Sequence, residues 1–376
     1  MNDEYYNGYD TEESYQPIEP EVFKPVKPVR SRPLFTYILL AVNILIWILT
    51  EYYGNKYDVN AHLKFGAKFN PLIMSGEYWR LVTPIFLHGD IIHLLMNSYF
   101  LYAVGPTVER IFGKFKFITI YLIAGIIGNV ASFVFSTSLS VGASGSLFGL
   151  MGALLYVIRK DKRIFRSSFG INVILTIGIN LIYGFMNRAQ IDNFAHVGGL
   201  IGGYIAARMT GIIWERKSFG ERIQAFILIA VLIFGGIFAG FNSPANIEFK
   251  NRYELSIKAD KLIDDAIASF NEKNYSKSEE LSKELLEISG SNTNVRRIAL
   301  DLLASSLINQ RKNTQAVKYA KELVELNPER GHYLLGLSFY NLGREDDAII
   351  ELKKAYELNP LNTHAKELLD ELSGES

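Results

Sequence analysis

The sequence predicts an all-α protein in two parts, a polytopic membrane helical bundle followed by an α-solenoid. One observation is a change of composition: residues 34–240 are strongly apolar, whereas residues 247–376 are rich in Lys and Glu. Another is the pattern within each part, because the first contains stretches long enough to cross a bilayer and the second repeats a helical pattern. The formal net charge of zero averages these two regions, so it identifies no partner.

Seven stretches are long and apolar enough to cross about 30 Å of hydrocarbon, which takes roughly 20 residues. They cover approximately 34–53, 90–108, 116–136, 143–158, 170–187, 193–213 and 223–240. The first begins after Pro33 and is too long and too late in the chain for a cleaved signal peptide, so we interpret it as a true span. We therefore expect a six-helix core over 34–213 and a seventh transmembrane helix over 223–240.

The positions of Lys and Arg predict the side of the membrane on which each loop lies, because these residues are retained in the cytoplasm. Fifteen of them flank the span ends that share a side with the N-terminus, and five flank the opposite ends. We expect a cytoplasmic N-terminus and, after seven crossings, an extracytoplasmic domain over 247–376, in a bacterial-type plasma membrane. Residues 1–33 have few aliphatic side chains and a basic stretch before the first span, which predicts a disordered cytoplasmic tail.

Residue types that the chain lacks argue against several kinds of site. It has no cysteine, so a disulfide, a cysteine-based zinc site and a thiol nucleophile are excluded. It has no His-Glu-x-x-His motif, and His88 and His93 are five residues apart on different faces of a helix, which argues against a zinc protease. Asp90 and Asp192 lie at span edges, whereas an aspartyl membrane protease needs them deep in spans. Without a basic stripe or an RNA-reading motif, nucleic acid is not an expected partner.

Polar side chains inside three of the spans mark a candidate site, since such residues are costly in hydrocarbon. Ser144 and His196 lie near the starts of the fourth and sixth spans, and the second span carries His93 and Asn97. These three spans run in the same direction, so the four residues are expected within about two turns, roughly 10 Å, of one membrane boundary. Each alone is more typical of a packing residue, but four at one depth favour a site.

Small residues are expected to bring the fourth and sixth spans together. Spacing of three or four residues places them on one face of a helix, and small side chains there let two backbones approach closely. Such packing would put the Ser144 hydroxyl within hydrogen-bond reach of the His196 imidazole, as a serine nucleophile and its base require. The glycines with this spacing are Gly145 and Gly149 on the fourth span and Gly199 and Gly203 on the sixth.

His93 and Asn97 are four residues apart and share one helical face. As neutral donors they could stabilise the oxyanion of a tetrahedral intermediate, together with the backbone N–H of Ser144 at the start of its helix. The alternative is that both side chains are tied into interhelical hydrogen bonds. The spacing alone does not decide between these two roles.

These residues resemble the motifs of the rhomboid intramembrane serine proteases over about 34–213. The resemblance implies that Ser144 is the nucleophile and His196 the general base of a Ser-His dyad. It also implies hydrolysis of a peptide bond in or near a substrate's transmembrane segment, without a metal or an organic cofactor. The motifs that carry it are Gly142-Ala143-Ser144-Gly145, the stretch from Ala195-His196 to Gly203, and His93 with Asn97.

Other positions follow the same resemblance. Trp79-Arg80 matches the Trp-Arg pair of the family's membrane-dipping first loop, and Phe148 lies where the family tends to carry an aromatic ring beside the histidine. Asp192 lies one turn before His196; the family uses a dyad, so an orienting role for this residue is a separate hypothesis. The seventh span resembles the form of the family with an added C-terminal helix.

The second part of the chain resembles tetratricopeptide repeats. Residues 329–360 fit the repeat pattern, a weaker copy ends at Asn327-Pro328, and a still weaker one lies near 262–287. Stacked helix pairs of this kind form a concave peptide-binding surface. We therefore expect the domain over 247–376 to recruit substrates or another protein partner, with a structural cap or a dimer contact as the alternative.

The sequence as a whole predicts an intramembrane serine protease that acts on transmembrane-protein substrates in the lipid bilayer. The alternative is a non-hydrolytic membrane scaffold that binds transmembrane helices and presents them to other quality-control proteins. Inactive relatives usually lack the serine or the histidine, so the presence of both Ser144 and His196 favours the protease.

Overall fold

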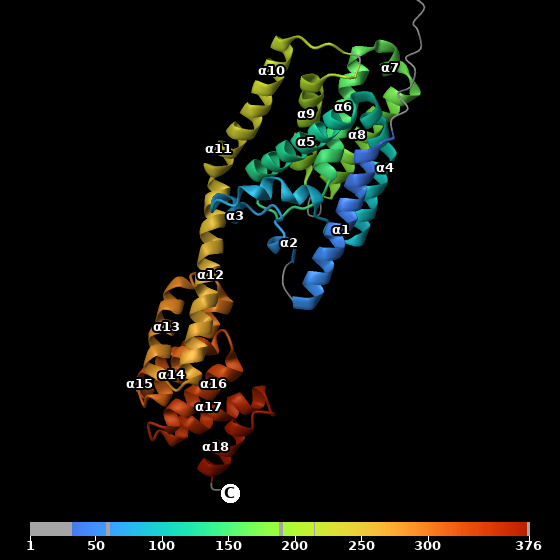
Figure 1. Cartoon of the computed structure of the whole chain (residues 1–376). Helices are drawn as coiled ribbons and strands as arrows, with labels where there is room; N and C mark the ends of the chain where they lie inside the picture. Colours follow the sequence, from blue (N-terminus) through green and yellow to red (C-terminus); the bar gives the residue numbers. More distant parts are fainter. Residues whose placement is uncertain (1–31, 58–60, 188–190, 214, 374–376) are drawn as a thin grey trace, which may run out of the picture.

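The computed structural model describes residues 32–57, 61–187, 191–213 and 215–373 (Figure 1). Within these ranges every regular element is a helix, apart from one antiparallel bridge between Lys68 and Ser140. The all-α class is therefore confirmed. The expected tail over 1–33 lies almost wholly outside the described residues.

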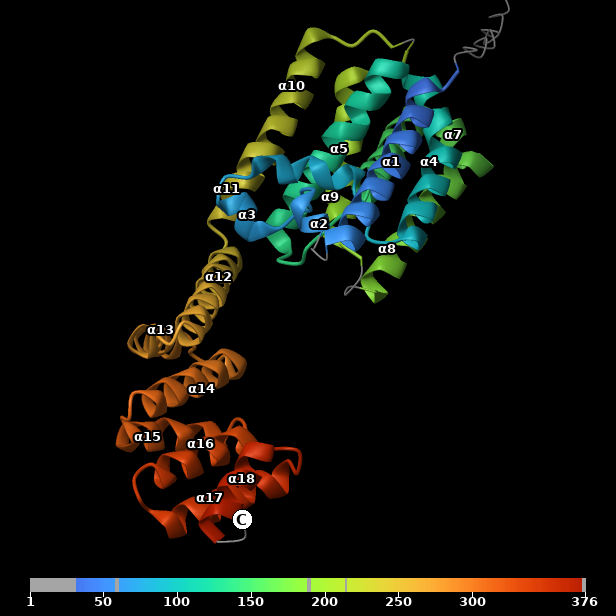
Figure 2. The same ribbon diagram turned by 60° about the horizontal axis from the view of Figure 1, so that its bottom comes forward.

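The bundle contains the seven expected spans as helices. The first six are α1 (Leu34–Tyr57), α4 (Ile91–Phe112), α5 (Lys114–Phe135), α6 (Ser144–Lys160), α8 (Ser168–Met186) and α9 (Asn193–Thr210). The seventh consists of α10 (Phe219–Ala230), a π-helical turn over Val231–Gly235 and α11 (Gly236–Phe241). A short helix, α7 (Lys162–Arg166), connects α6 to α8. Figure 2 shows α10 and α11 at the edge of the bundle, and α11 packs on α5.

Five of these helices, among the residues that the structure describes, are long and apolar enough to cross a membrane on their own: α1, α4, α5, α8 and the α10–α11 helix. The two others, α6 with 17 residues and α9 with 18, are short and rich in glycine. Most residues of α6 and half of those of α9 are buried, and both helices pack on α5 and on each other. Protein therefore surrounds α6 and α9 where lipid surrounds the outer helices, so they need less hydropathy.

A buried carboxylate joins α4 to the first span. Glu109 accepts hydrogen bonds from the backbone N–H of Phe35 at 3.0 Å, from the N–H of Thr36 at 2.9 Å and from the Thr36 hydroxyl at 2.8 Å. The first N–H groups of a helix have no partner within the helix, so this carboxylate caps α1. These bonds explain how a charged side chain is fully buried here.

Residues 61–87 form a loop of short helices between α1 and α4. The elements are α2 (Ala61–Lys64), α3 (Asn70–Met74) and 3-10 turns at Tyr78–Leu81 and Thr83–Phe86. Arg80 is buried within the loop, where it donates to the carbonyl oxygens of Leu63 at 2.7 Å and Ala67 at 3.0 Å and pairs with Glu77 at 2.6 Å. Trp79, its neighbour, is exposed. In the matched Trp-Arg pair, Arg80 therefore holds the loop together, whereas Trp79 lies on its surface.

The second part of the chain is a stack of helices that follows one long helix out of the bundle (Figure 1). Each helix packs against the next, and Gly336 allows α16 to approach α17, since a Cβ there would lie 2.7 Å from Leu352. The helices are α12 (Pro244–Asn271), α13 (Tyr275–Ile288), α14 (Thr293–Asn309), α15 (Asn313–Val324), α16 (Pro328–Tyr340), α17 (Glu345–Leu358) and α18 (Thr363–Ser373).

Contacts between α12 and the loop over 61–87 attach this stack to the bundle. The side-chain amide of Asn70 donates to that of Asn246 at 2.6 Å, and Asn246 donates to the carbonyl oxygen of Phe133 at 2.8 Å. The ring of Phe69 packs edge-on against Phe249 and Tyr253, with centroid distances of 5.4 and 5.0 Å. Asn246 and Phe133 are both buried, and Phe133 lies in the last turn of α5. The stack therefore leaves the bundle at the end where α5 finishes and α6 begins.

Candidate active site

The structure brings the fourth and sixth spans together at their first turns. Ser144 is the first residue of α6, and His196 lies in the first turn of α9. The Oγ of Ser144 is 2.9 Å from Nε2 of His196, within hydrogen-bond distance. The Phe148 ring, one turn along α6, stacks on the imidazole with centroids 4.3 Å apart and an interplanar angle of 15°. The His196 side chain is thereby held between a hydroxyl and an aromatic face.

Glycines at the α6–α9 contact allow this approach. A Cβ at Gly199 would overlap the backbone of Gly145, and a Cβ at Gly203 would overlap that of Gly149. No larger residue fits at these positions without moving one helix. The small-residue spacing therefore corresponds to a backbone-to-backbone contact, and it sets the distance between Ser144 and His196.

Sequence reasoning missed a third helix at this contact. On α5, a Cβ at Gly128 would lie 2.7 Å from the carbonyl oxygen of Ala195, the residue before His196. A Cβ at Gly198 on α9 would lie 3.2 Å from the Cα of Gly128. The signal was present as glycines in the third span, but that span carries no candidate site residue, so nothing linked it to the site.

His93 and Asn97 face the turn that leads into α6. A Cβ added to Gly142 would lie 2.8 Å from Nε2 of His93 and 3.7 Å from Nδ2 of Asn97. Gly142 has φ +133°, a conformation that favours glycine, so this residue both makes the turn and leaves room for the two side chains. The Nδ2 of Asn97 is buried and has no hydrogen-bond partner among the described residues. A donor of this kind is available to an acceptor that the chain itself does not supply.

Asp192 stabilises the start of α9: its carbonyl oxygen accepts from the backbone N–H of His196 at 3.2 Å, but among the described residues its carboxylate makes no hydrogen bond with the His196 imidazole. Its Oδ1 accepts from the backbone N–H of Ala195 at 3.1 Å, and its Oδ2 accepts from the hydroxyl of Ser132 on α5. A carboxylate at this position satisfies a free N–H and interacts favourably with the helix dipole. The Nδ1 of His196 is buried without a hydrogen-bond partner among the described residues. Asp192 therefore orients the histidine only through the helix that both residues share.

A buried lysine, which sequence reasoning counted only as a loop charge, supports the turn before Ser144. The Nζ of Lys68 donates to the carbonyl oxygens of Ser136 at 2.8 Å and Ser138 at 3.0 Å. Its backbone exchanges two hydrogen bonds with Ser140, at 2.9 and 3.1 Å. Burial lowers the pKa of Lys68 to about 8, although Asp192 acts in the opposite direction. The segment from α5 to Gly142 is thus fixed from the loop over 61–87.

The arrangement provides a hydroxyl, an imidazole in contact with it and two further donors beside the same turn. Within the described ranges, no three His, Asp or Glu side chains converge in a way that could hold a metal ion. The side chains of the site can supply nucleophilic attack by an oxygen, proton transfer by an imidazole and stabilisation of a developing negative charge.

Comparison with known proteins matches one family model to each of the two parts of the chain. A model described as the Rhomboid domain matches residues 75–213, and one described as the Tetratricopeptide repeat matches 299–330 and 329–360. The latter two matches confirm the repeat over 329–360 and the copy that ends at Asn327-Pro328. The third copy, expected near 262–287, lies outside these two matched ranges and coincides with the packed pair α12 and α13.

Several curated proteins are similar to the chain. "Rhomboid protease GluP" of Bacillus subtilis is 40% identical over 311 residues, which cover 83% of this chain and 57% of that protein. "RHOMBOID-like protein 9, chloroplastic" of Arabidopsis thaliana is 37% identical over 44% of this chain and 39% of that protein. The chain thus spans only about half the length of these two relatives. "Putative rhomboid protease YdcA" of Bacillus subtilis is 32% identical, with 47% of this chain and 88% of that protein covered. The chain belongs to the rhomboid family and carries tetratricopeptide repeats after its membrane bundle.

Proposed function

We propose that the chain is an intramembrane serine protease, which hydrolyses peptide bonds in or near the transmembrane segments of membrane proteins. The observation that carries the proposal is the 2.9 Å distance between Ser144 Oγ and His196 Nε2, at the ends of two helices in backbone contact. The relatives GluP and YdcA are named as a rhomboid protease and a putative rhomboid protease, which supports the same activity here.

In the proposed reaction, Nε2 of His196 takes the proton of the Ser144 hydroxyl as Oγ attacks the carbonyl carbon of the substrate. The neutral imidazole that does this carries its proton on Nδ1. His196 then gives the proton to the leaving amine, which leaves an acyl-enzyme ester. Water, activated by the same imidazole, hydrolyses the ester and regenerates the hydroxyl. The stacked ring of Phe148 keeps the imidazole in place through these steps.

The negative charge on the carbonyl oxygen needs donors that are fixed before the reaction begins. The Nδ2 of Asn97, which is buried without a partner among the described residues, is one such donor. His93 lies beside it at Gly142, and the backbone N–H of Ser144 lies at the start of α6. We assign these three groups to the oxyanion site. A role for Asn97 in interhelical hydrogen bonding is disfavoured, since Nδ2 has no acceptor in the part of the neighbouring helices that the structure describes.

For orientation, we propose a cytoplasmic N-terminus and an extracytoplasmic repeat domain in a bacterial-type plasma membrane. The distribution of Lys and Arg in the sequence supports it, with fifteen at the span ends on the proposed cytoplasmic side and five on the other. The start of α6, and with it Ser144, then lies near the outer boundary. Both the site and the repeats would face the same compartment.

We further propose that the repeats recruit substrates or a protein partner. A cavity of about 250 Å³ lies on the stack, lined by side chains of α12, α14 and α16, the first helices of three successive pairs. Its lining combines apolar side chains such as Ile267 with charged ones such as Arg297, which suits an extended peptide segment. The contacts of Asn70 with Asn246 and of Phe69 with Phe249 attach the start of α12, whose other end lines this cavity, to the bundle.

Cleavage of a single-pass model substrate by the purified full-length chain tests the protease. We expect product from the wild type and none from Ser144→Ala or His196→Ala, with all three proteins equally helical and monodisperse. Equal product from all three would mean a contaminating protease and would refute the dyad. If no membrane-protein substrate is cleaved but the chain still binds transmembrane helices, the scaffold alternative is correct.

A pair of point variants tests recruitment. Ile267→Glu places a charge in the cavity on the stack, whereas Ile350→Glu places one on an exposed position of α17 outside it. We expect both variants to cleave a model transmembrane substrate at the wild-type rate. In cells, only Ile267→Glu should lose cleavage of native substrates, and equal cleavage by both would refute recruitment through this surface.

A further inference from the structure

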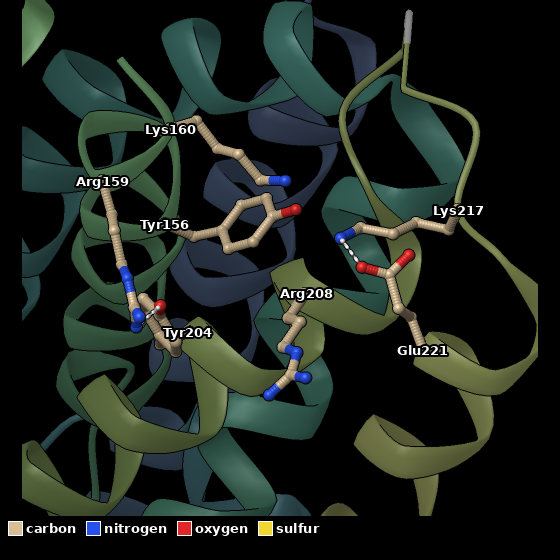
Figure 3. Close-up of a pocket in the computed structure, with 7 residues that line it drawn as sticks. All are labelled: Tyr156, Arg159, Lys160, Tyr204, Arg208, Lys217 and Glu221. Atoms are coloured by element: carbon tan, nitrogen blue, oxygen red, sulfur yellow. Dashed lines mark hydrogen bonds and ion pairs between the residues drawn. The ribbon is translucent and has the colours of Figure 1, made fainter. Parts of the chain in front are cut away.

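A second polar site lies at the opposite end of the bundle from Ser144. There the ends of α6 and α9 meet the segment that leads into α10, around a cavity of about 360 Å³. Figure 3 shows side chains from all three segments turned towards it. The lining consists of four cations, two tyrosines and one carboxylate: Arg159, Lys160, Arg208, Lys217, Tyr156, Tyr204 and Glu221.

The two lysines of this cavity are already neutralised. Glu215, beside the cavity, pairs with Lys160 at 2.7 Å and with Lys217 at 3.1 Å and accepts a hydrogen bond from Tyr156 at 2.8 Å. Burial alone would raise the pKa of Glu215, but these hydrogen bonds lower it to about 2, so it stays ionised. Lys217 has a second carboxylate, Glu221, at 3.4 Å.

The two arginines, in contrast, have only neutral partners. Arg159 donates to the hydroxyl of Tyr204 at 2.9 Å, and Arg208 donates to the side-chain oxygen of Gln224 at 3.3 Å. Neither guanidinium has a carboxylate within ion-pair distance in the part of the chain that the structure describes. With four cations against Glu215 and Glu221, the cavity keeps an excess of positive charge, and this excess lies on the two arginines.

We propose that this cavity binds a phosphate group, and that its natural source is the head group of an anionic phospholipid. Guanidinium groups bind phosphate oxygens with two parallel hydrogen bonds, and a tyrosine hydroxyl adds a further donor. The cavity lies at the end of membrane helices, and Phe219 and Ile223 on α10 beside it are exposed apolar residues. A lipid whose phosphate lies in the cavity would therefore have its acyl chains next to an apolar surface.

The bound phosphate would connect two helices of the six-helix core, because Arg159 lies on α6 and Arg208 on α9. Arg208 also donates to Gln224 on α10, at the start of the seventh span. A zwitterionic head group also carries a phosphate, but its own cation cancels the charge that the arginines require. The site therefore distinguishes anionic from zwitterionic lipids.

The test uses the purified full-length chain in a neutral detergent and measures thermal unfolding against added ligand. The ligands are phosphatidylglycerol, phosphatidylcholine and inorganic phosphate. The cavity variant is Arg159→Gln with Arg208→Gln; the control, Arg110→Gln with Arg166→Gln, removes the same charge from exposed arginines outside the cavity. We expect phosphatidylglycerol to stabilise the wild type and the control equally, and its apparent affinity to fall at least about tenfold in the cavity variant.

The ligand series also distinguishes the sources of the phosphate. One outcome is that inorganic phosphate stabilises the wild type but not the cavity variant, and phosphatidylglycerol stabilises neither. This result would support a phosphate-binding cavity and assign it to a soluble ligand. Equal stabilisation of the wild type and the cavity variant by phosphatidylglycerol, with no effect of phosphate, would overturn the proposal. If the double variant does not fold, Arg208→Gln alone serves the same comparison, since Arg208 donates to a neutral side chain, that of Gln224.

Discussion

Replacing Gly128 by alanine tests whether the contact between α5 and α9 positions the imidazole. The added Cβ would lie 2.7 Å from the carbonyl oxygen of Ala195, and ordinary contact begins at 3.4 Å, so α9 must move away by about 0.7 Å. A shift of this size along the Ser144–His196 direction would lengthen the 2.9 Å contact to about 3.6 Å, beyond hydrogen-bond range. Because a misplacement of about 1 Å costs roughly 100-fold in rate, we expect kcat to fall by about 10- to 100-fold.

The same substitution should destabilise the fold by about 1–3 kcal/mol, the usual cost of overpacking. The matched control is Gly178→Ala on α8, where an added Cβ meets nothing within 4 Å. That variant should keep the wild-type kcat and unfold at the same or a slightly higher temperature. The assay is initial-rate cleavage of the model substrate, with kcat and KM separated, together with thermal unfolding. Wild-type kcat in Gly128→Ala would refute the reasoning.

Further substitutions test the oxyanion donor, the cap of α1 and the buried lysine. Asn97→Ala should lower kcat by about 100- to 1,000-fold with little change in KM, and a change in KM alone would argue against an oxyanion role. Glu109→Ala leaves the first N–H groups of α1 without an acceptor and should cost about 2–3 kcal/mol in thermal or denaturant unfolding. The pKa of Lys68 is lowered by burial to about 8, so the unfolded chain binds more protons between pH 8 and the ordinary lysine value of 10.5. Stability should therefore rise with pH across this window in the wild type and rise less in Lys68→Met; parallel curves would contradict the assignment.

The sequence predicted the all-α class and the helices of the bundle because hydrocarbon imposes a length and an apolar composition on every span. It also indicated which residues lie together at Ser144, since glycines at fixed spacing predict where backbones touch. It did not predict the position of α5 against α9. Glycines in an apolar span have no polar neighbour to reveal their partner, and only the folded bundle shows that Gly128 meets Ala195.

Lys68 and Glu109 show a second limit of sequence reasoning. A charged residue in or beside a loop is usually solvated, yet both of these side chains are fully buried. Their partners are mostly backbone groups, the carbonyl oxygens of Ser136 and Ser138 for one and the N–H groups of Phe35 and Thr36 for the other. Every residue has such groups, so their positions are set by the tertiary fold and leave no pattern in the sequence.

The helices that carry Ser144 and His196 are also those that least resemble transmembrane segments, and the proposed chemistry explains why. Glycine brings the two backbones together, and a hydroxyl and an imidazole require polar surroundings; each of these features lowers hydropathy. Such helices would be poorly stable in lipid by themselves. Outer helices, α1, α4, α8 and α10, present apolar side chains to the membrane, and α6 and α9 are buried behind them. The composition of α6 and α9 can therefore follow the needs of the site, while the bundle as a whole meets those of the bilayer.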